Sequence, residues 1–152
     1  LAQDLKSENV LLFDNKVAKL CDFGLSRRSE SAMPVDKELV TVWYRAPELL
    51  MGDASYSSRI DEWGAGCVAL EMLMGVAPFR GRPECRCACD APAHRNYNSD
   101  QLGRIFALVG TPGDRAWLGR KACAAHFIHW PPFPNKLHSA VRRGCEACVR
   151  GE

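Results

Sequence analysis

The chain has 152 residues, of which 47% are apolar, and its formal net charge at pH 7 is +2. This length suits one domain or part of a larger one, and so small a charge argues against nucleic acid as the main partner. Eight cysteines are too few for a small disulfide scaffold and follow no signal-like segment, so we expect mostly free thiols in a reducing compartment.

The first predicted element is a β-hairpin. Residues 10–13 and 17–21 are strand-like, and the polar residues 14–16 between them favour a turn. With the turn centred between Asn15 and Lys16, the facing residues have numbers that sum to 31, which sets Asn9 opposite Asp22. Their Cα atoms would then lie about 5 Å apart.

Oxygen ligands converge at the open end of this predicted hairpin. Asn9 and Asp22 would face each other there, and Asp4, five residues before Asn9, could reach the same place. Hard divalent cations such as Mg²⁺ take oxygen ligands and leave room for phosphate oxygens, so the pattern indicates a site for a metal-nucleotide complex. Alternatively, each of these residues only ends a strand or starts a turn.

A helix is predicted over residues 60–74, followed by a second with Ser99 as its N-cap. Apolar residues surround the first helix, so we expect it to be buried rather than half exposed; its acidic residues exclude a membrane span. The second helix is expected to end at Gly110, with Pro112 beyond. The residues expected in the core are Ile60, Trp63, Cys67, Val68, Leu70 and Met74 in the first helix and Leu102, Ile105, Phe106 and Val109 in the second.

The remaining cysteines follow no zinc-binding pattern. The segment 82–98 has a C-x-C-x-C run with His94 nearby, which lacks the paired C-x₂-C spacing of structural zinc modules, and we interpret it as a flexible insertion. Cys145 and Cys148 form one C-x-x-C, but no βαβ pattern precedes it. A zinc module remains a distant alternative. The thiols of the run are Cys85, Cys87 and Cys89.

Several motifs together resemble the eukaryotic protein kinase family. The run DLKSEN at 4–9, followed by DFG at 22–24, is similar to the catalytic-loop and metal-binding signature of these enzymes. The resemblance continues through APE at 46–48 and DEWGAG at 61–66 and covers about residues 1 to 134. The stretches TVWYRAPELL and DQLGRIFALVGTP most resemble the cyclin-dependent kinase group.

The resemblance implies a mainly α fold with a short β-hairpin, which corresponds to part of the kinase C-lobe. Residues 1–134 would form a partial kinase domain with an insertion at about 82–98, and 135–152 a divergent, flexible tail. The N-lobe motifs and the last C-lobe helices are not recognised, so we expect this fragment alone to be inactive. The parent chain would be an ATP- and Mg²⁺-dependent serine/threonine kinase; the alternative is a truncated, inactive module that binds protein partners.

Residue roles follow from the same resemblance. Asp4 would be the catalytic base, and Lys6 would contact the transferred phosphate. Asn9 and Asp22 would hold Mg²⁺, whose charge phosphoryl transfer requires, and Leu11 would contact the nucleotide.

Four further residues are expected to shape the site. Thr41 would brace the base and the lysine against the substrate, and Arg45 would favour proline after the acceptor, unless it makes an ordinary surface ion pair. Glu48 would close the activation segment. Asp61 either completes the start of its helix, in capping-box spacing from Ser58, or accepts hydrogen bonds from the catalytic-loop backbone.

One departure from the family concerns regulation. Ala2-Gln3 replaces the expected His-Arg, and Gln3 supplies no charge to hold a phosphorylated residue. Asp36 stands where that phosphothreonine would be, and its carboxylate either docks on Arg27 or Arg28 or is an exposed loop residue. The implied partners are protein substrates with Ser/Thr-Pro and a cyclin-like activator, without nucleic acid or membrane, in the cytoplasm or nucleus.

Overall fold

The computed structural model describes residues 1–14, 16–28, 42–51, 53, 56–81, 98–112 and 131–150. Helices dominate this part of the chain and a single antiparallel pair of strands accompanies them, which confirms the predicted mainly α fold with a hairpin. No described helix is long and apolar enough to cross a membrane. In chain order the elements are η1 (Ser7–Asn9), β1 (Val10–Phe13), β2 (Val17–Leu20), η2 (Val42–Tyr44), α1 (Pro47–Leu50), α2 (Arg59–Met74), α3 (Asn98–Val109) and α6 (Leu137–Arg150).

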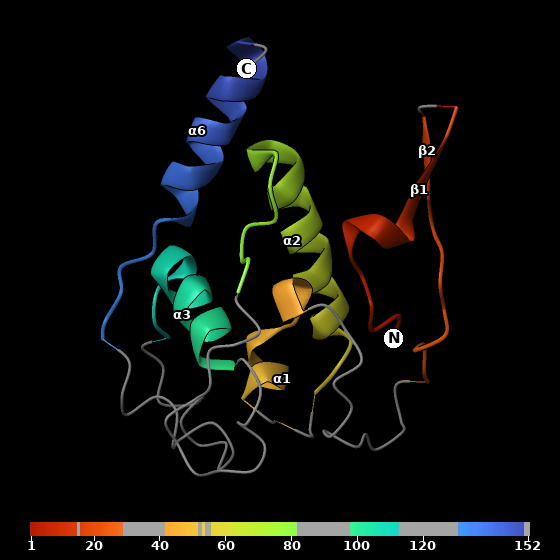
Figure 1. Cartoon of the computed structure of the whole chain (residues 1–152), viewed down its shortest axis with the longest axis horizontal. Helices are drawn as coiled ribbons and strands as arrows, with labels where there is room; N and C mark the ends of the chain where they lie inside the picture. The colour runs from red at the N-terminus through yellow and green to blue at the C-terminus, as the bar shows by residue number, and fades with distance from the viewer. Residues whose placement is uncertain are drawn as a thin grey trace.

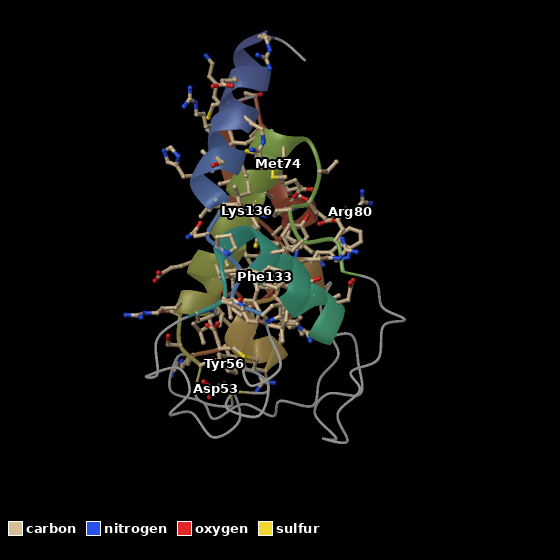
Figure 2. All side chains as sticks on the ribbon, turned by 90° about the vertical axis from the view of Figure 1, so that its left-hand side faces the viewer. Asp53, Tyr56, Met74, Arg80, Phe133 and Lys136 are labelled. Atoms are coloured by element: carbon tan, nitrogen blue, oxygen red, sulfur yellow. The ribbon has the colours of Figure 1, made fainter. Side chains whose placement is uncertain are left out.

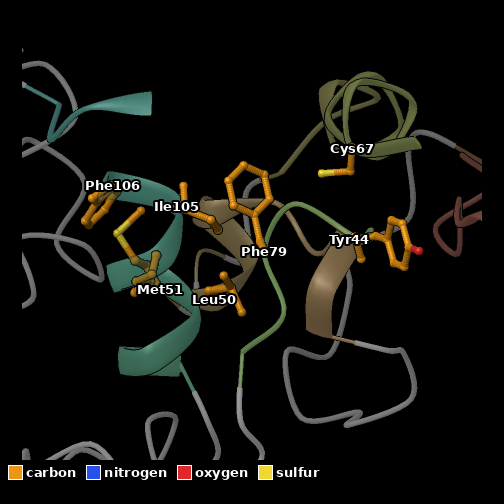
Figure 3. Close-up of a cluster of buried hydrophobic side chains, with 9 residues drawn as sticks. Tyr44, Leu50, Met51, Cys67, Phe79, Ile105 and Phe106 are labelled. Carbon is orange, nitrogen blue, oxygen red and sulfur yellow. The ribbon is translucent and has the colours of Figure 1, made fainter. Parts of the chain in front are cut away.

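Helix α2 lies in the middle of the molecule, with α3 and α6 on one side and the hairpin at the opposite edge (Figure 1). Its C-terminus is closed by Gly75, which adopts a left-handed conformation with φ 69° and donates its N–H to the Glu71 carbonyl at 2.8 Å. The core fills the space between α1, α2, α3 and the loop after α2 (Figure 3). Its members include Tyr44, Leu50, Met51, Cys67, Phe79, Leu102, Ile105 and Phe106.

Helix α3 agrees closely with its prediction. It ends at Val109 as expected, but it begins at Asn98, so Ser99 lies inside the first turn and is not the predicted N-cap. Gly110 follows in a left-handed conformation with φ 87°, a geometry that glycine adopts without strain. The side chains of Leu102, Ile105 and Phe106 are buried and Val109 is partly buried, as their helical spacing predicts.

The hairpin exists, but its predicted register is wrong by one residue. Val10 pairs with Leu20 and Phe13 with Val17, so facing residues sum to 30 rather than 31. The connection therefore takes up residues 14–16, with Asp14 in a left-handed conformation at φ 51°. Asn9 consequently lies opposite Cys21, whose N–H donates to the Asn9 carbonyl at 2.9 Å, and Asp22 follows one residue later.

The expectation that α2 is buried on all sides is also wrong. Ile60 and Cys67 are buried, and Trp63, Val68 and Leu70 are partly buried, but Met74 is 39% exposed and Met72 is 75% exposed. Met74 is labelled at the end of α2 beside α6 in Figure 2. Helix α6 packs against α2, but the Met72 and Met74 side chains in the last turn of α2 are left exposed by the described residues.

The segment 135–152 was expected to be a flexible tail, and this expectation is wrong because α6 forms over most of it. Asn135 accepts the Leu137 N–H through Oδ1 at 2.9 Å. The helix packs on α2 and α3 through Ala140 and Gly144, both buried. A Cβ atom on Gly144 would lie only 2.8 Å from the Leu73 carbonyl oxygen, so the absence of a side chain permits this contact.

Of the two cysteine patterns, the structure describes only one side chain, that of Cys145. Residues 82–97, with the C-x-C-x-C run and His94, lie outside the described residues. Cys145 is exposed on α6, and the side chain of Cys148 lies outside the described set. The described residues contain no group of three or more His, Cys, Asp or Glu side chains placed to hold a metal ion.

Candidate active site

The loop 1–6 and the 3-10 helix η1 bring three polar side chains together. Lys6 Nζ donates to Asp4 Oδ2 at 2.9 Å, and the two side chains are 19% and 7% exposed. Asn9 Nδ2 donates to the Asp4 backbone carbonyl at 2.9 Å and to Asp4 Oδ2 at 3.1 Å. A lysine and an amide therefore converge on one carboxylate oxygen in a largely buried setting.

The second carboxylate oxygen of Asp4 has a different environment. Oδ1 is buried and has no hydrogen-bond partner among the described residues. A buried, unpartnered acceptor is costly unless something binds to it. Because Oδ2 already receives two donors, Oδ1 is the atom of Asp4 that is free to accept a hydrogen bond from a ligand hydroxyl.

Asp61, in the first turn of α2, holds the backbone of this loop in place. Its two carboxylate oxygens accept the Ala2 and Gln3 N–H groups, each at 2.8 Å. Gln3 has φ 68°, a left-handed conformation that is unfavourable for a residue with a side chain. Ser58 makes no side-chain cap hydrogen bond. The Asp61 carboxylate instead accepts hydrogen bonds from the backbone of loop 1–6, which was one of the two alternatives for this residue.

The loop also lies directly on α2. A Cβ atom on Gly64 would lie 3.0 Å from both the Leu5 Cβ and the Leu5 carbonyl oxygen. Only a glycine lets the helix approach the backbone that closely. The loop is thereby fixed between Asp61 and Gly64, one turn apart on the same helix.

Tyr44 connects this loop to α2 from a third direction. Its hydroxyl donates to Glu71 Oε2 at 2.7 Å and lies 3.0 Å from Ser7 Oγ in η1. Burial, assisted by the Glu71 carboxylate, raises the pKa of Tyr44 from 10.0 to about 12. The loop that carries Asp4 is therefore also hydrogen-bonded to the η2 turn.

The raised pKa of Tyr44 predicts how stability changes at alkaline pH. The unfolded tyrosine loses its proton near pH 10, before the folded one does, so its contribution is complete below pH 10 and is lost as pH rises towards 12. We therefore expect the free energy of unfolding of the unmodified chain to fall more steeply over this range than that of the Tyr44→Phe variant. Denaturant titrations at several pH values measure both, and parallel curves would contradict the expectation.

Of the two predicted metal ligands, Asn9 contacts Asp4, and Asp22 lies one residue beyond the position opposite Asn9. Asp22 is exposed, has φ 57°, and accepts the Gly24 N–H through Oδ1 at 3.1 Å. Because Asn9 Nδ2 points to Asp4, the other side-chain atom, Oδ1, is the one available to a cation. A carboxylate and an amide oxygen on adjacent strand ends are suitable ligands for Mg²⁺.

The structure describes only some of the other predicted site residues. Thr41 and Asp36 lie outside the described residues. Arg45 and Glu48 are partly buried on either side of the start of α1, and both take part in interactions within the chain. Leu11 lies on β1 and is 45% exposed.

Sequence reasoning missed Ser7, Tyr44 and Glu71 as parts of this site. Ser7 lies inside the catalytic-loop motif and Tyr44 inside TVWYRAPELL, so motif membership was the available signal. Glu71 lies ten residues after Asp61, on the same helix, and nothing in the local sequence separates it from an ordinary solvated glutamate.

The fold and this arrangement define a protein kinase catalytic domain. The family model described as Protein kinase domain matches residues 1–101, and the chain belongs to this family. It is 41% identical over 120 residues to Cyclin-dependent kinase 14 of Xenopus tropicalis, covering 78% of this chain and 25% of the relative. The human Cyclin-dependent kinase 14 is also 41% identical over 120 residues, with 78% and 23% covered.

A solved structure supports the same assignment. The present chain is similar to a chain in the crystal structure of the yeast RNA Pol II CTD kinase CTDK-1 complex, with a TM-score of 0.75 and 26% sequence identity. The match covers 94% of this chain and 44% of the other. The chain is therefore a cyclin-dependent-kinase-like piece that spans about a quarter of the length of its curated relatives.

Proposed function

We propose that this chain supplies the catalytic loop and metal ligands of an ATP-dependent serine/threonine kinase that is proline-directed and corresponds to part of the C-lobe. The observation that carries the proposal is the asymmetry of Asp4. One carboxylate oxygen receives Lys6 and Asn9, and the other is buried without a partner among the described residues. This arrangement suits a base that is held in position while one oxygen remains free for a substrate.

In this function Asp4 Oδ1 accepts the hydrogen bond of the acceptor Ser or Thr hydroxyl and takes its proton. The hydroxyl oxygen then bonds to the γ-phosphorus of ATP while the bond from this phosphorus to the bridging oxygen breaks, and ADP leaves. The Lys6–Asp4 ion pair fixes the carboxylate. Lys6 Nζ, next to this carboxylate, would also neutralise charge on the transferred phosphoryl group. Asp61 and Tyr44 keep the loop rigid, so that a near-attack geometry is available without rearrangement.

Asn9 Oδ1 and the Asp22 carboxylate would hold Mg²⁺ with ATP, and Leu11 would contact the nucleotide. When bound, the cation neutralises charge on the phosphate oxygens. The exposure of Asp22 and Leu11 leaves both accessible to such a ligand. Further nucleotide contacts would come from residues of the parent chain.

Substrate choice would depend on the η2–α1 junction. Arg45 directly follows η2 and donates its N–H to the Val42 carbonyl at 3.2 Å, which fixes its backbone. With Thr41 it would form the pocket for the residue after the acceptor and favour proline. The proposal includes a cyclin-like activator and a cytoplasmic or nuclear location. It also includes Asp36 as a built-in substitute for a phosphate.

The test uses the full-length gene product, isolated from its own cells by an affinity tag so that any bound activator is retained. With Mg²⁺ and ATP it is expected to phosphorylate Ser and Thr in a peptide library, with enrichment of proline immediately after the acceptor. The matched control is a library in which alanine replaces the acceptor. Absence of transfer, together with specific retention of protein partners, would favour the inactive binding module instead.

A further inference from the structure

Gln101 is a polar side chain buried completely, at 0% exposure, in the second turn of α3. Burying an amide is unfavourable unless its hydrogen-bonding groups are satisfied. Both the oxygen and the nitrogen of the Gln101 amide are hydrogen-bonded. Its Oε1 accepts the Gly81 N–H at 3.0 Å, and its Nε2 donates to the Trp43 carbonyl at 3.4 Å.

Trp43 completes a closed ring of hydrogen bonds. Its indole Nε1–H donates to the Gly81 carbonyl at 3.0 Å, so Trp43, Gly81 and Gln101 are each bonded to the other two. The guanidinium of Arg80, labelled in Figure 2, lies 4.9 Å from the centre of the Trp43 ring, in cation-π geometry. Gly81 has no room for a side chain, because a Cβ atom would collide with Gln101.

This ring holds one side of the η2 turn, and the catalytic loop holds the other. Trp43 is fixed to α3 and to the loop after α2, whereas the next residue, Tyr44, is bonded to Ser7 and Glu71. Arg45 follows immediately and is hydrogen-bonded back to Val42. A displacement of Trp43 would therefore move Arg45 relative to Asp4.

We propose that Gln101 is a positioning residue that sets the substrate-binding segment, and thereby the preference for the residue after the acceptor. The inference rests on the proposed kinase function. Gln101 touches neither the substrate nor the reacting atoms. It acts through the Trp43 carbonyl and through Gly81, which in turn holds the indole ring.

The experiment compares the full-length product with its Gln101→Met variant, which keeps side-chain length but loses both hydrogen bonds. We expect the KM for a Ser-Pro peptide to rise about fivefold to tenfold while kcat changes by less than about twofold, because binding rather than chemistry is affected. The preference for Ser-Pro over Ser-Ala should fall by a similar factor. The matched control is Arg104→Ala, which removes only an exposed ion pair with Asp100 on the same helix.

A second variant keeps the inference falsifiable if Gln101→Met does not fold. Trp43→Phe retains an aromatic ring for Arg80 but removes the indole N–H, and should lower the proline preference in the same way. Combining both changes should cost little more than either alone, since they break one ring. Unchanged KM and proline preference in either folded variant would overturn the inference.

Failure of the proposed function gives a different result, namely no phosphate transfer by the unmodified protein. Hydrogen exchange then decides the inference separately. The Trp43 indole N–H and the Gly81 amide should exchange faster in Gln101→Met than in Arg104→Ala. Equal protection in both variants would show that Gln101 does not hold the segment.

Discussion

Replacing Asp4 by asparagine is expected to lower the kcat of the full-length product by about 10² to 10⁴-fold, the usual contribution of a positioned general base. The amide keeps the shape of the side chain but cannot accept the proton of the acceptor hydroxyl. It also removes the charge that Lys6 pairs with at 2.9 Å. Steady-state kinetics with a Ser-Pro peptide measure the change.

A matched control separates loss of the base from loss of negative charge near the loop. Glu8 lies in η1, four residues after Asp4, and is exposed. Its Glu8→Gln variant should retain kcat within about twofold, because a solvated carboxylate contributes little to a buried centre. A fall in kcat of less than tenfold in Asp4→Asn would contradict the assignment of Asp4 as the base.

Removing the carboxylate of Asp61 should give the largest loss of stability. Two charge-assisted hydrogen bonds of 2.8 Å disappear in Asp61→Ala, and the Ala2 and Gln3 N–H groups lose their acceptors. Gln3 would no longer be held in its left-handed conformation. We expect the free energy of unfolding to fall by about 2 to 4 kcal/mol.

Denaturant unfolding monitored by circular dichroism measures this change in the chain. Glu62→Ala provides the control, because Glu62 is the next residue of the same helix turn and is exposed. It should shift the unfolding free energy by no more than about 0.5 kcal/mol. Similar losses in both variants would mean that the first turn of α2, rather than the two Asp61 hydrogen bonds, determines the effect.

The proximity of the candidate site residues was easier to predict from the sequence than the register of the hairpin. Asp4, Lys6 and Asn9 are only a few residues apart, so their proximity follows from a short loop, and the structure brings them together. The predicted pairing of Asp22 with Asn9, in contrast, depended on where the turn of the hairpin is centred. Asp14 enters a left-handed conformation, which shifts the register by one residue, and no local pattern distinguishes the two registers.

Helices were predictable where large apolar residues marked one face. The buried face of α3 carries Leu102, Ile105 and Phe106, and this helix begins two residues before the position that an N-cap at Ser99 predicts. Helix α6 was missed because its buried contacts come from Ala140 and Gly144, small residues that add little to a hydrophobic pattern. These small residues let α6 pack closely against α2, and this contact is seen only in the tertiary structure.

The role of Gln101 could not be predicted for a related reason. A glutamine at the start of an amphipathic helix is ordinarily solvated, and the motif in which it lies gives it no distinct task. Its partners, Trp43 and Gly81, lie 58 and 20 residues away in sequence. Contacts that distant depend on the packing of α3 against η2 rather than on any local preference.

The hydrogen bond between Gly81 and Gln101 joins two residues that lie 20 positions apart in the sequence. Once the ends of a chain segment are held together, lengthening it costs only about 0.6 kcal/mol of loop-closure entropy per doubling. Adding residues between Gly81 and Gln101 should therefore lower the free energy of unfolding only slightly through this entropy.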